Sequence, residues 1–137
     1  MKEKTNHTQH EEGMKSICKK HSIELMVLFG SRAHGTGRPN SDMDVAVKAV
    51  KGSRTDRLGL ILDLERIFHK SVDLVIVSPI TDPLLLNEIF TNGEPVYQRN
   101  KGVFVRWRTF AWHCFLDTQW IRDRQWAWIK KNTAGAL

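Results

Sequence analysis

The sequence predicts an α/β domain in which a small mixed β-sheet is backed by helices. Three short runs are rich in Val, Ile and Leu and are bounded by turn residues, which is typical of buried strands; they are Ile23–Phe29, Met43–Val50 and Val72–Val77. Segments with apolar residues at helical spacing alternate with these runs. With 137 residues, the chain is long enough for one domain with a substantial core.

The first elements are expected to lead into the buried sheet. Residues 1–13 are polar and are predicted to be flexible or loosely attached. Residues 14–21 are predicted to form a short helix with one apolar side. The nearly continuous apolar run Ile23–Phe29 favours a first strand that is buried on both faces. Residues 36–40 contain glycine and proline and are expected to form a mobile loop before the second strand, Met43–Val50.

Two helices are predicted to flank the third strand. Apolar residues at helical spacing predict the first of them over Arg54–His69, and Ser53 can act as its N-cap. The second begins at Pro83, because proline is favoured at the first helical position, where no N–H is needed. Either Thr81 or Asp82 can cap this second helix.

The chain is expected to close with a short strand and a helical tail. Gly93 ends the preceding helix, and Glu94–Tyr97 forms the last strand. Residues 101–131 are predicted to form one long helix or two broken ones. The chain is thereby divided into a flexible N-terminus, a core at residues 14–97 and a tail at residues 98–137.

The tail differs from the core in charge and in aromatic content. Up to residue 97, 13 basic residues balance 13 acidic ones, whereas residues 98–137 contain 8 basic and 2 acidic residues, so the whole net charge of +6 lies there. All five tryptophans are also in the tail: Trp107, Trp112, Trp120, Trp126 and Trp128. Such a division predicts an interaction surface beside a neutral core.

Only part of the tail is expected to pack against the sheet. Spacings of three and four residues predict a packed face, formed by Phe104, Trp107, Phe110, Ala111, Cys114 and Phe115. Trp120, Trp126 and Trp128 cannot share one helical face, so they predict an exposed aromatic surface that marks a partner interface. A basic and aromatic surface could also stack on RNA bases. Because no part of the tail resembles an RNA-binding module, we expect a protein partner.

The turn after the first strand carries residues that are suited to binding phosphate. Gly30 allows the backbone to come close to a phosphate, and Ser31 can offer a hydroxyl and an N–H at the start of a short helix, where the dipole favours anions. Asp42 and Asp44 follow the glycine-rich loop at the start of the second strand, where a two-residue spacing places both carboxylates on the same face. Two adjacent carboxylates suit Mg²⁺ that bridges substrate phosphates.

A third carboxylate lies within the next predicted strand. Asp73 interrupts an otherwise apolar, β-branched run, and a charge inside such a strand is costly unless it is paired or binds a metal. If this strand lies beside the second one, the side chains of Asp42, Asp44 and Asp73 meet. Three carboxylates can hold two metal ions about 3.5–4 Å apart, the arrangement used for in-line attack on phosphorus.

These motifs together resemble the minimal nucleotidyltransferases of the polymerase-β superfamily. The family signature is Gly-Ser, a loop rich in Gly and Arg, Ser-Asp-x-Asp, and a later Asp on a strand; here it stands as residues 30–35, Ser41–Asp44 and Asp73. The resemblance extends over about residues 23–97 and includes a closing strand that follows Gly93. One departure is His34, where the family more often has arginine.

The resemblance implies a metal-dependent nucleotidyl transfer. Asp42 and Asp44 would hold one Mg²⁺ on the triphosphate of ATP, and a second ion would be held by all three aspartates. Asp73 would assist as general base. The acceptor hydroxyl would attack the α-phosphorus, and pyrophosphate would leave.

The triphosphate itself is expected to contact the loop after the first strand. Ser31 and the Gly30 turn would grip the β- and γ-phosphates. Arg32 and Arg38 are candidates for further triphosphate contacts, although a solvated loop position explains these two charges equally well.

The resemblance also implies an acceptor. Minimal nucleotidyltransferases of this size are often encoded beside a HEPN-domain RNase toxin, so the chain is expected to be the antitoxin, which moves AMP onto a tyrosine of that toxin in a heteromeric complex. Three alternatives stay open: a small-molecule transferase of the aminoglycoside type, a non-catalytic antitoxin that masks its partner by binding, and an enzyme that adds nucleotides to nucleic-acid ends. The basic tail argues against cationic antibiotics as substrates.

The remaining composition predicts a cytoplasmic protein. Cys18 and Cys114 follow no metal-ligand or Cys-x-x-Cys spacing, so we expect two free thiols in a reducing compartment. No apolar run approaches the roughly 20 residues of a membrane span. Residues 1–12 are polar and carry no segment that could act as a signal peptide.

Overall fold

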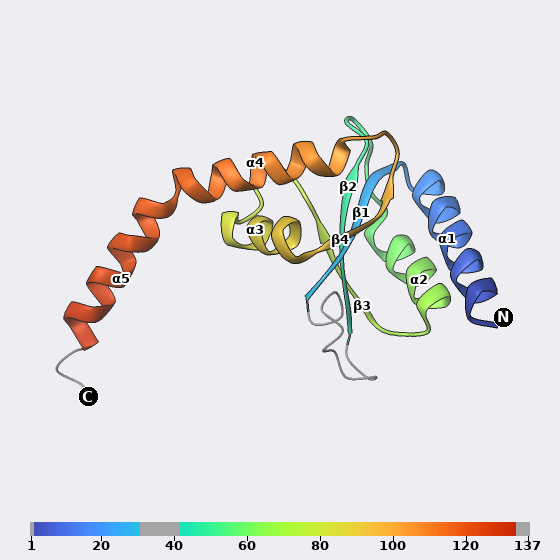
Figure 1. The fold of residues 1–137 in the computed structure, drawn as a ribbon, viewed down its shortest axis with the longest axis horizontal. Coiled ribbons are helices and arrows are strands. Elements are labelled where there is room, and N and C mark those ends of the chain that lie inside the picture. Colours follow the sequence, from blue (N-terminus) through green and yellow to red (C-terminus); the bar gives the residue numbers. More distant parts are fainter. Residues whose placement is uncertain (1, 31–41, 134–137) are drawn as a thin grey trace.

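The structure of the chain, a computed structural model, describes residues 2–30 and 42–133. These residues form five helices and four strands (Figure 1). In chain order the elements are α1 (Lys2–Lys20), β1 (Ile23–Phe29), β2 (Met43–Ala49), α2 (Arg57–Phe68), β3 (Val72–Ile76), α3 (Pro83–Asn92), β4 (Glu94–Gln98), α4 (Val103–Asp117) and α5 (Gln119–Thr133). Among the described residues, no helix combines the length and the apolar character needed to cross a membrane.

The four strands form one mixed sheet in the order β3-β2-β1-β4. β1 is antiparallel to both β2 and β4, whereas β2 and β3 are parallel. The parallel pair is joined through α2, as parallel neighbours require a crossover connection. The prediction of an α/β domain with a small mixed sheet is confirmed.

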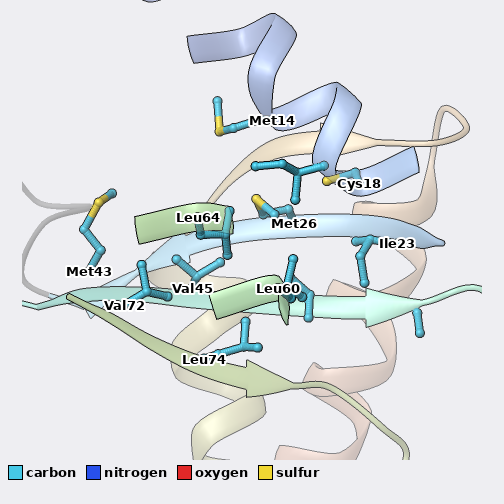
Figure 2. Close-up of a cluster of buried hydrophobic side chains, with 13 residues drawn as sticks. Met14, Cys18, Ile23, Met26, Met43, Val45, Leu60, Leu64, Val72 and Leu74 are labelled. Atoms are coloured by element: carbon cyan, nitrogen blue, oxygen red, sulfur yellow. The ribbon is translucent and has the colours of Figure 1, made fainter. Parts of the chain in front are cut away.

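Helices cover both faces of the sheet (Figure 1). α1 and α2 pack on one face, where Met26, Val45 and Leu64 lie in one buried cluster (Figure 2). α3 and α4 pack on the other face around a second cluster that includes Ala46 and Phe90. Successive residues of a strand point to opposite faces, so the alternation along β2 fixes which side chains face α3 and α4.

The first helix begins much earlier than expected. We predicted a flexible segment over residues 1–13 and a helix from Met14, but α1 begins at Lys2. Part of this extension packs against α2, which the polar composition of the segment does not reveal: the centroid of the His10 ring lies 6.4 Å from that of the Phe68 ring, in edge-to-face geometry. The prediction that Met14 and Cys18 lie on the buried side of this helix is confirmed.

The second helix begins later than expected. Asp56, not Ser53, is its N-cap, and the Asp56 carboxylate accepts a hydrogen bond of 3.1 Å from the Gly59 N–H. Ser53 instead belongs to the preceding turn, where its N–H donates to the Val50 carbonyl. His69 ends the helix in a left-handed conformation, with φ of 54°.

The third helix matches its prediction. The Asp82 carboxylate accepts hydrogen bonds of 2.8 and 3.2 Å from the N–H groups of Leu84 and Leu85, and Pro83 occupies the first helical position. The Gly93 N–H donates to the Ile89 carbonyl as the helix ends. Local capping chemistry was sufficient here because each cap contacts only its own helix.

The tail forms two helices that are broken at Thr118. α4 lies along α3 and buries Phe104 and Ala111, whereas α5 buries no residue and extends away from the domain (Figure 1). Phe110 was expected in the packed face of α4 but is exposed. It lies beside the packed positions, where its ring contacts the edge of the Trp107 ring at 5.3 Å instead of the sheet. The predicted free thiols are confirmed, since Cys18 and Cys114 form no disulfide.

Candidate active site

Three segments of the chain meet at one end of the sheet. β1 is antiparallel to β2, so the end of β1 at Gly30 lies next to the start of β2, and Phe29 pairs with Asp44. β3 is parallel to β2, so its start lies at the same end, and Asp44 pairs with Asp73. The topology therefore brings together residues that are far apart in the sequence.

Asp44 and Asp73 are direct neighbours on one face of the sheet. Paired positions on adjacent strands lie about 5 Å apart. Both residues alternate with side chains that pack under α1 and α2, so their carboxylates lie on the opposite face, the one that carries α3 and α4. The expectation that the third strand lies beside the second is confirmed.

Asp42 lies immediately before β2 rather than within it. Its side chain is exposed, yet its charge acts on Asp44. The predicted start of the second strand at Met43 is confirmed, so Asp44 lies within the strand and Asp42 just before it. Asp42 therefore has more freedom to turn toward a ligand than a residue held in the sheet.

The electrostatics of Asp44 are unusual for a surface carboxylate. Partial burial raises the pKa of Asp44 above its ordinary value, and the neighbouring charges of Asp73 and Asp42 raise it further. None of the ion pairs formed among the described residues involves any of these three aspartates. The arrangement concentrates negative charge without a counterion from these parts of the chain.

Gly30 is required by the position of Asp44. Its φ of 77° lies in the left-handed region, which side chains other than glycine rarely adopt. A Cβ atom at this position would also collide with the Asp44 carboxylate. The sequence suggested that this glycine lets the backbone come close to a phosphate. The structure adds that the missing side chain leaves room for the Asp44 carboxylate.

The residues fit a magnesium ion that is completed by its substrate. Within residues 2–30 and 42–133, no three His, Cys, Asp or Glu side chains are grouped tightly enough to hold a metal ion by themselves. Mg²⁺, however, is usually bound by one or two carboxylates together with substrate phosphates and water. The paired carboxylates of Asp44 and Asp73, with the charge of Asp42 close by, have the oxygen chemistry that this binding mode needs.

The remaining predicted site residues lie outside the described residues. These are Ser31, Arg32 and Arg38, together with His34, and their contacts with a triphosphate stay predictions. Gly30 is the last described residue before them, and it lies at the same sheet end as Asp44.

A groove of about 560 Å³ lies between α3 and α4. Gly93 lines one part of it, and the next residue, Glu94, pairs with Leu28 near the end of β1 that carries Gly30. No sequence pattern pointed to this groove, because its walls come from two helices that meet only in the folded chain. Its lining is Asn87, Phe90, Thr91, Gly93, Phe104, Arg108, Thr109, Ala111, Trp112 and His113.

Solved structures of similar fold come from toxin–antitoxin complexes. A chain from a toxin–antitoxin complex with AMP-PNP is 24% identical, with a TM-score of 0.66, and the match covers 83% of this chain and 96% of that one. A chain from the MntA–HepT toxin–antitoxin complex is 23% identical, with a TM-score of 0.58 and coverage of 85% and 97%. A chain from a complex of tri-AMPylated Shewanella oneidensis HEPN toxin with MNT antitoxin is 22% identical, with a TM-score of 0.57 and coverage of 85% and 96%.

These likenesses establish a shared fold. No curated protein shows significant sequence similarity to this chain. Residues 12–102, however, match the family described as polymerase beta, nucleotidyltransferase, and this range contains every element of the sheet and all three aspartates. The chain therefore belongs to the polymerase-β nucleotidyltransferase family.

Proposed function

We propose that the chain transfers AMP from ATP to a hydroxyl group of a partner protein, with Asp42, Asp44 and Asp73 as its catalytic residues. The observation that carries this proposal is the pairing of Asp44 with Asp73, which places two carboxylates side by side at the sheet end next to Gly30. The family supplies the reaction class, and the AMP-PNP in a structure of similar fold supports ATP as the nucleotide.

Asp42 and Asp44 would hold Mg²⁺ together with the triphosphate, and Asp73 would share a second ion. When bound, these ions neutralise the triphosphate charge and lower the pKa of the attacking hydroxyl. Asp73 is exposed, so an acceptor can reach its carboxylate.

The protein's own carboxylates then position the reacting groups. The acceptor oxygen attacks the α-phosphorus in line, the bond from the α-phosphorus to the bridging oxygen breaks, and pyrophosphate leaves. Asp73 accepts the hydroxyl proton as general base. Ser31 and the Gly30 turn, with Arg32 and Arg38, are proposed to hold the phosphates of ATP.

We further propose that the acceptor is a tyrosine of a HEPN-domain RNase toxin and that the chain acts as its antitoxin. Support comes from the complexes of similar fold, one of which contains an AMPylated HEPN toxin. The basic, aromatic tail at residues 98–137 is proposed as the surface that holds this partner in a heteromeric complex, because α5 is left without packing inside the described chain.

Intact-mass spectrometry tests this function. The product of the neighbouring gene, which the proposal expects to be a HEPN-domain protein, is incubated with the chain, ATP and Mg²⁺, and an Asp44→Asn variant serves as control. Mass gains in whole adenylate units with the wild type alone are expected. A stable complex without any mass gain would contradict transfer and favour an antitoxin that acts by masking.

A further inference from the structure

Large side chains recur at every fourth position along the two helices of the tail. Trp112 and Leu116 on α4 are followed by Trp120, Arg124 and Trp128 on α5, and we call these five residues the ridge. The exposed fractions of its apolar members are 56%, 42%, 58% and 66%, in chain order. Rows of residues spaced by four are the ridges that pack into the grooves of another helix.

The ridge has no cover within the described chain. α5 buries none of its residues and points away from the sheet (Figure 1). Exposed aromatic surface of this extent is unfavourable in water and usually marks a site of association. We therefore expect another molecule to bind over the ridge.

Arg122 fixes the direction in which α5 presents the ridge. Its guanidinium stacks on the Phe115 ring, 4.0 Å from the ring centroid, and also donates to the Phe115 carbonyl. The same guanidinium donates a 2.8 Å hydrogen bond to the Thr118 hydroxyl, which donates in turn to the Cys114 carbonyl at 2.7 Å. These contacts cross the break between the two helices, so the ridge is organised before a partner binds.

Charge identifies the kind of occupant. α5 contains four cations and one anion: Arg122, Arg124, Lys130, Lys131 and Asp123. A second copy of the chain would bring these cations against one another, which disfavours self-association through α5. An acidic surface would complement them.

The side chains of the ridge favour protein over nucleic acid. Leu116 is aliphatic and cannot stack on a base, although stacking provides much of the affinity for single strands. The Arg124 guanidinium lies 5.8 Å from the centroid of the Trp120 ring, so the ridge offers a cation and a large apolar surface at one place. Tryptophan and arginine are the residues that most often dominate protein–protein affinity.

We propose that the ridge docks into the groove of a helical, acidic surface on the partner protein. The proposal rests on the function proposed above for the identity of that partner, and it assigns the contact to one side of α5. Two residues of a helix that are two positions apart point about 200° away from each other. Trp126, which is 63% exposed, therefore points away from the part of the ridge that lies on α5, and it provides a control matched in type and exposure to Trp128.

The test measures partner affinity in matched pairs. Calorimetry gives the Kd for the HEPN-domain protein, with every chain carrying Asp44→Asn so that no transfer occurs. Trp128→Ala is expected to weaken binding about tenfold or more, and Trp126→Ala less than about twofold. Arg124→Glu is expected to weaken binding more than Lys130→Glu does, because Lys130 lies about 120° around α5 from Arg124 and therefore off the ridge.

Equal losses at Trp126 and Trp128, or no binding by the parent chain, would overturn the proposal. A single-stranded RNA of mixed sequence is titrated in parallel; if Trp128→Ala weakens RNA binding but leaves the protein Kd unchanged, the ridge is an RNA surface instead. Transfer is read separately by mass in the wild-type background. If the partner gains no mass but the Kd values follow the expected pattern, the proposed AMP transfer is rejected and the proposed docking role of the ridge is retained.

Discussion

Two aspartates of this chain occupy opposite electrostatic surroundings. Asp63, on α2, lies 2.8 Å from the His21 ring and 3.0 Å from the Lys20 ammonium, and these two hydrogen bonds lower the pKa of its carboxyl. Asp44 has partial burial and the charges of Asp73 and Asp42 around it, and its pKa is raised. The chain thus provides the Asp63 carboxylate with positively charged hydrogen-bond donors, whereas the described residues provide the Asp44 carboxylate with no such partner.

The comparison separates a structural carboxylate from a candidate catalytic one. Asp63 connects the end of α1 to α2 through Lys20 and His21. Asp44 contributes no such connection among the described residues, and its crowding opposes folding while all three carboxylates are charged. Unfavourable negative charge concentrated at one end of the sheet is what a site for a cation and a triphosphate requires.

Opposite pKa shifts imply opposite effects of pH on stability. Folded Asp63 releases its proton more readily than unfolded Asp63, so its contribution is present above the ordinary aspartate pKa and is lost as pH falls toward the lowered one. Folded Asp44 holds its proton more tightly, so its contribution becomes unfavourable as pH rises through the range between the ordinary and the raised pKa.

The largest expected effect is the loss of transfer in Asp44→Asn. The substitution removes a proposed metal ligand and should lower the transfer rate about a thousandfold or more, whereas Asp63→Asn should retain transfer in the folded protein. Relief of repulsion means that the melting temperature of Asp44→Asn at neutral pH should not fall below that of the wild type. Initial rates of AMP incorporation and thermal unfolding check both statements; a strongly destabilised Asp44→Asn would identify Asp44 as structural.

Gly30→Ala should have the next largest effect, because it combines two costs. The left-handed conformation costs a non-glycine residue about 1–2 kcal/mol, and the new Cβ would also displace the Asp44 carboxylate. Gly52 has a similar φ of 85° but open space around its Cβ position, so Gly52→Ala isolates the backbone cost. Chemical denaturation should show a larger loss for Gly30→Ala, together with loss of transfer. Equal losses of stability in Gly30→Ala and Gly52→Ala would mean that the Asp44 carboxylate moves away from the new Cβ without cost.

Asp63→Asn should destabilise the fold by about 1–2 kcal/mol at neutral pH, since a buried imidazole and an ammonium lose a charged acceptor. The difference in unfolding free energy between the wild type and this variant should shrink as pH falls below the ordinary aspartate range, because the wild-type carboxyl is then protonated as well. Urea titrations of both proteins at several pH values measure this difference in unfolding free energy. If the difference in unfolding free energy stays constant with pH, the Asp63 carboxyl does not have a lowered pKa, and the contrast with Asp44 is contradicted.

Magnesium should have the smallest effect, and it should act at one site only. A ligand that binds only the folded chain, at ten times its Kd, adds about 1.4 kcal/mol of stability. Mg²⁺ with a non-hydrolysable ATP analogue should therefore raise the melting temperature of the wild type and of Asp63→Asn, but not that of Asp44→Asn. EDTA should reverse the shift. An equal shift in all three proteins would place the metal elsewhere.

The sequence predicted those features of the chain that depend on local chemistry. The strands β1 and β3 were found from their apolar runs, and the start of α3 at Pro83 was found from the proline, with Thr81 and Asp82 as the two candidate caps. The sequence indicated that the aspartates would meet only if the third strand lay beside the second, and the parallel pairing of β2 with β3 meets that condition for Asp44 and Asp73. Features that depend on distant contacts were not predictable: His10, in the segment expected to be flexible, packs against Phe68 of α2, and the groove between α3 and α4 exists only once these helices pack.

The most direct test of the central claim is to determine which phosphate of ATP, the α or the γ, is transferred to the partner. ATP labelled at the α-phosphate and ATP labelled at the γ-phosphate are incubated separately with the chain, Mg²⁺ and the HEPN-domain partner. The account predicts that the partner gains the α-label and not the γ-label, that Asp63→Asn retains this transfer and that Asp44→Asn abolishes it. Transfer of the γ-label, or transfer of the α-label that survives in Asp44→Asn, would contradict a nucleotidyl transfer carried out by this cluster of aspartates.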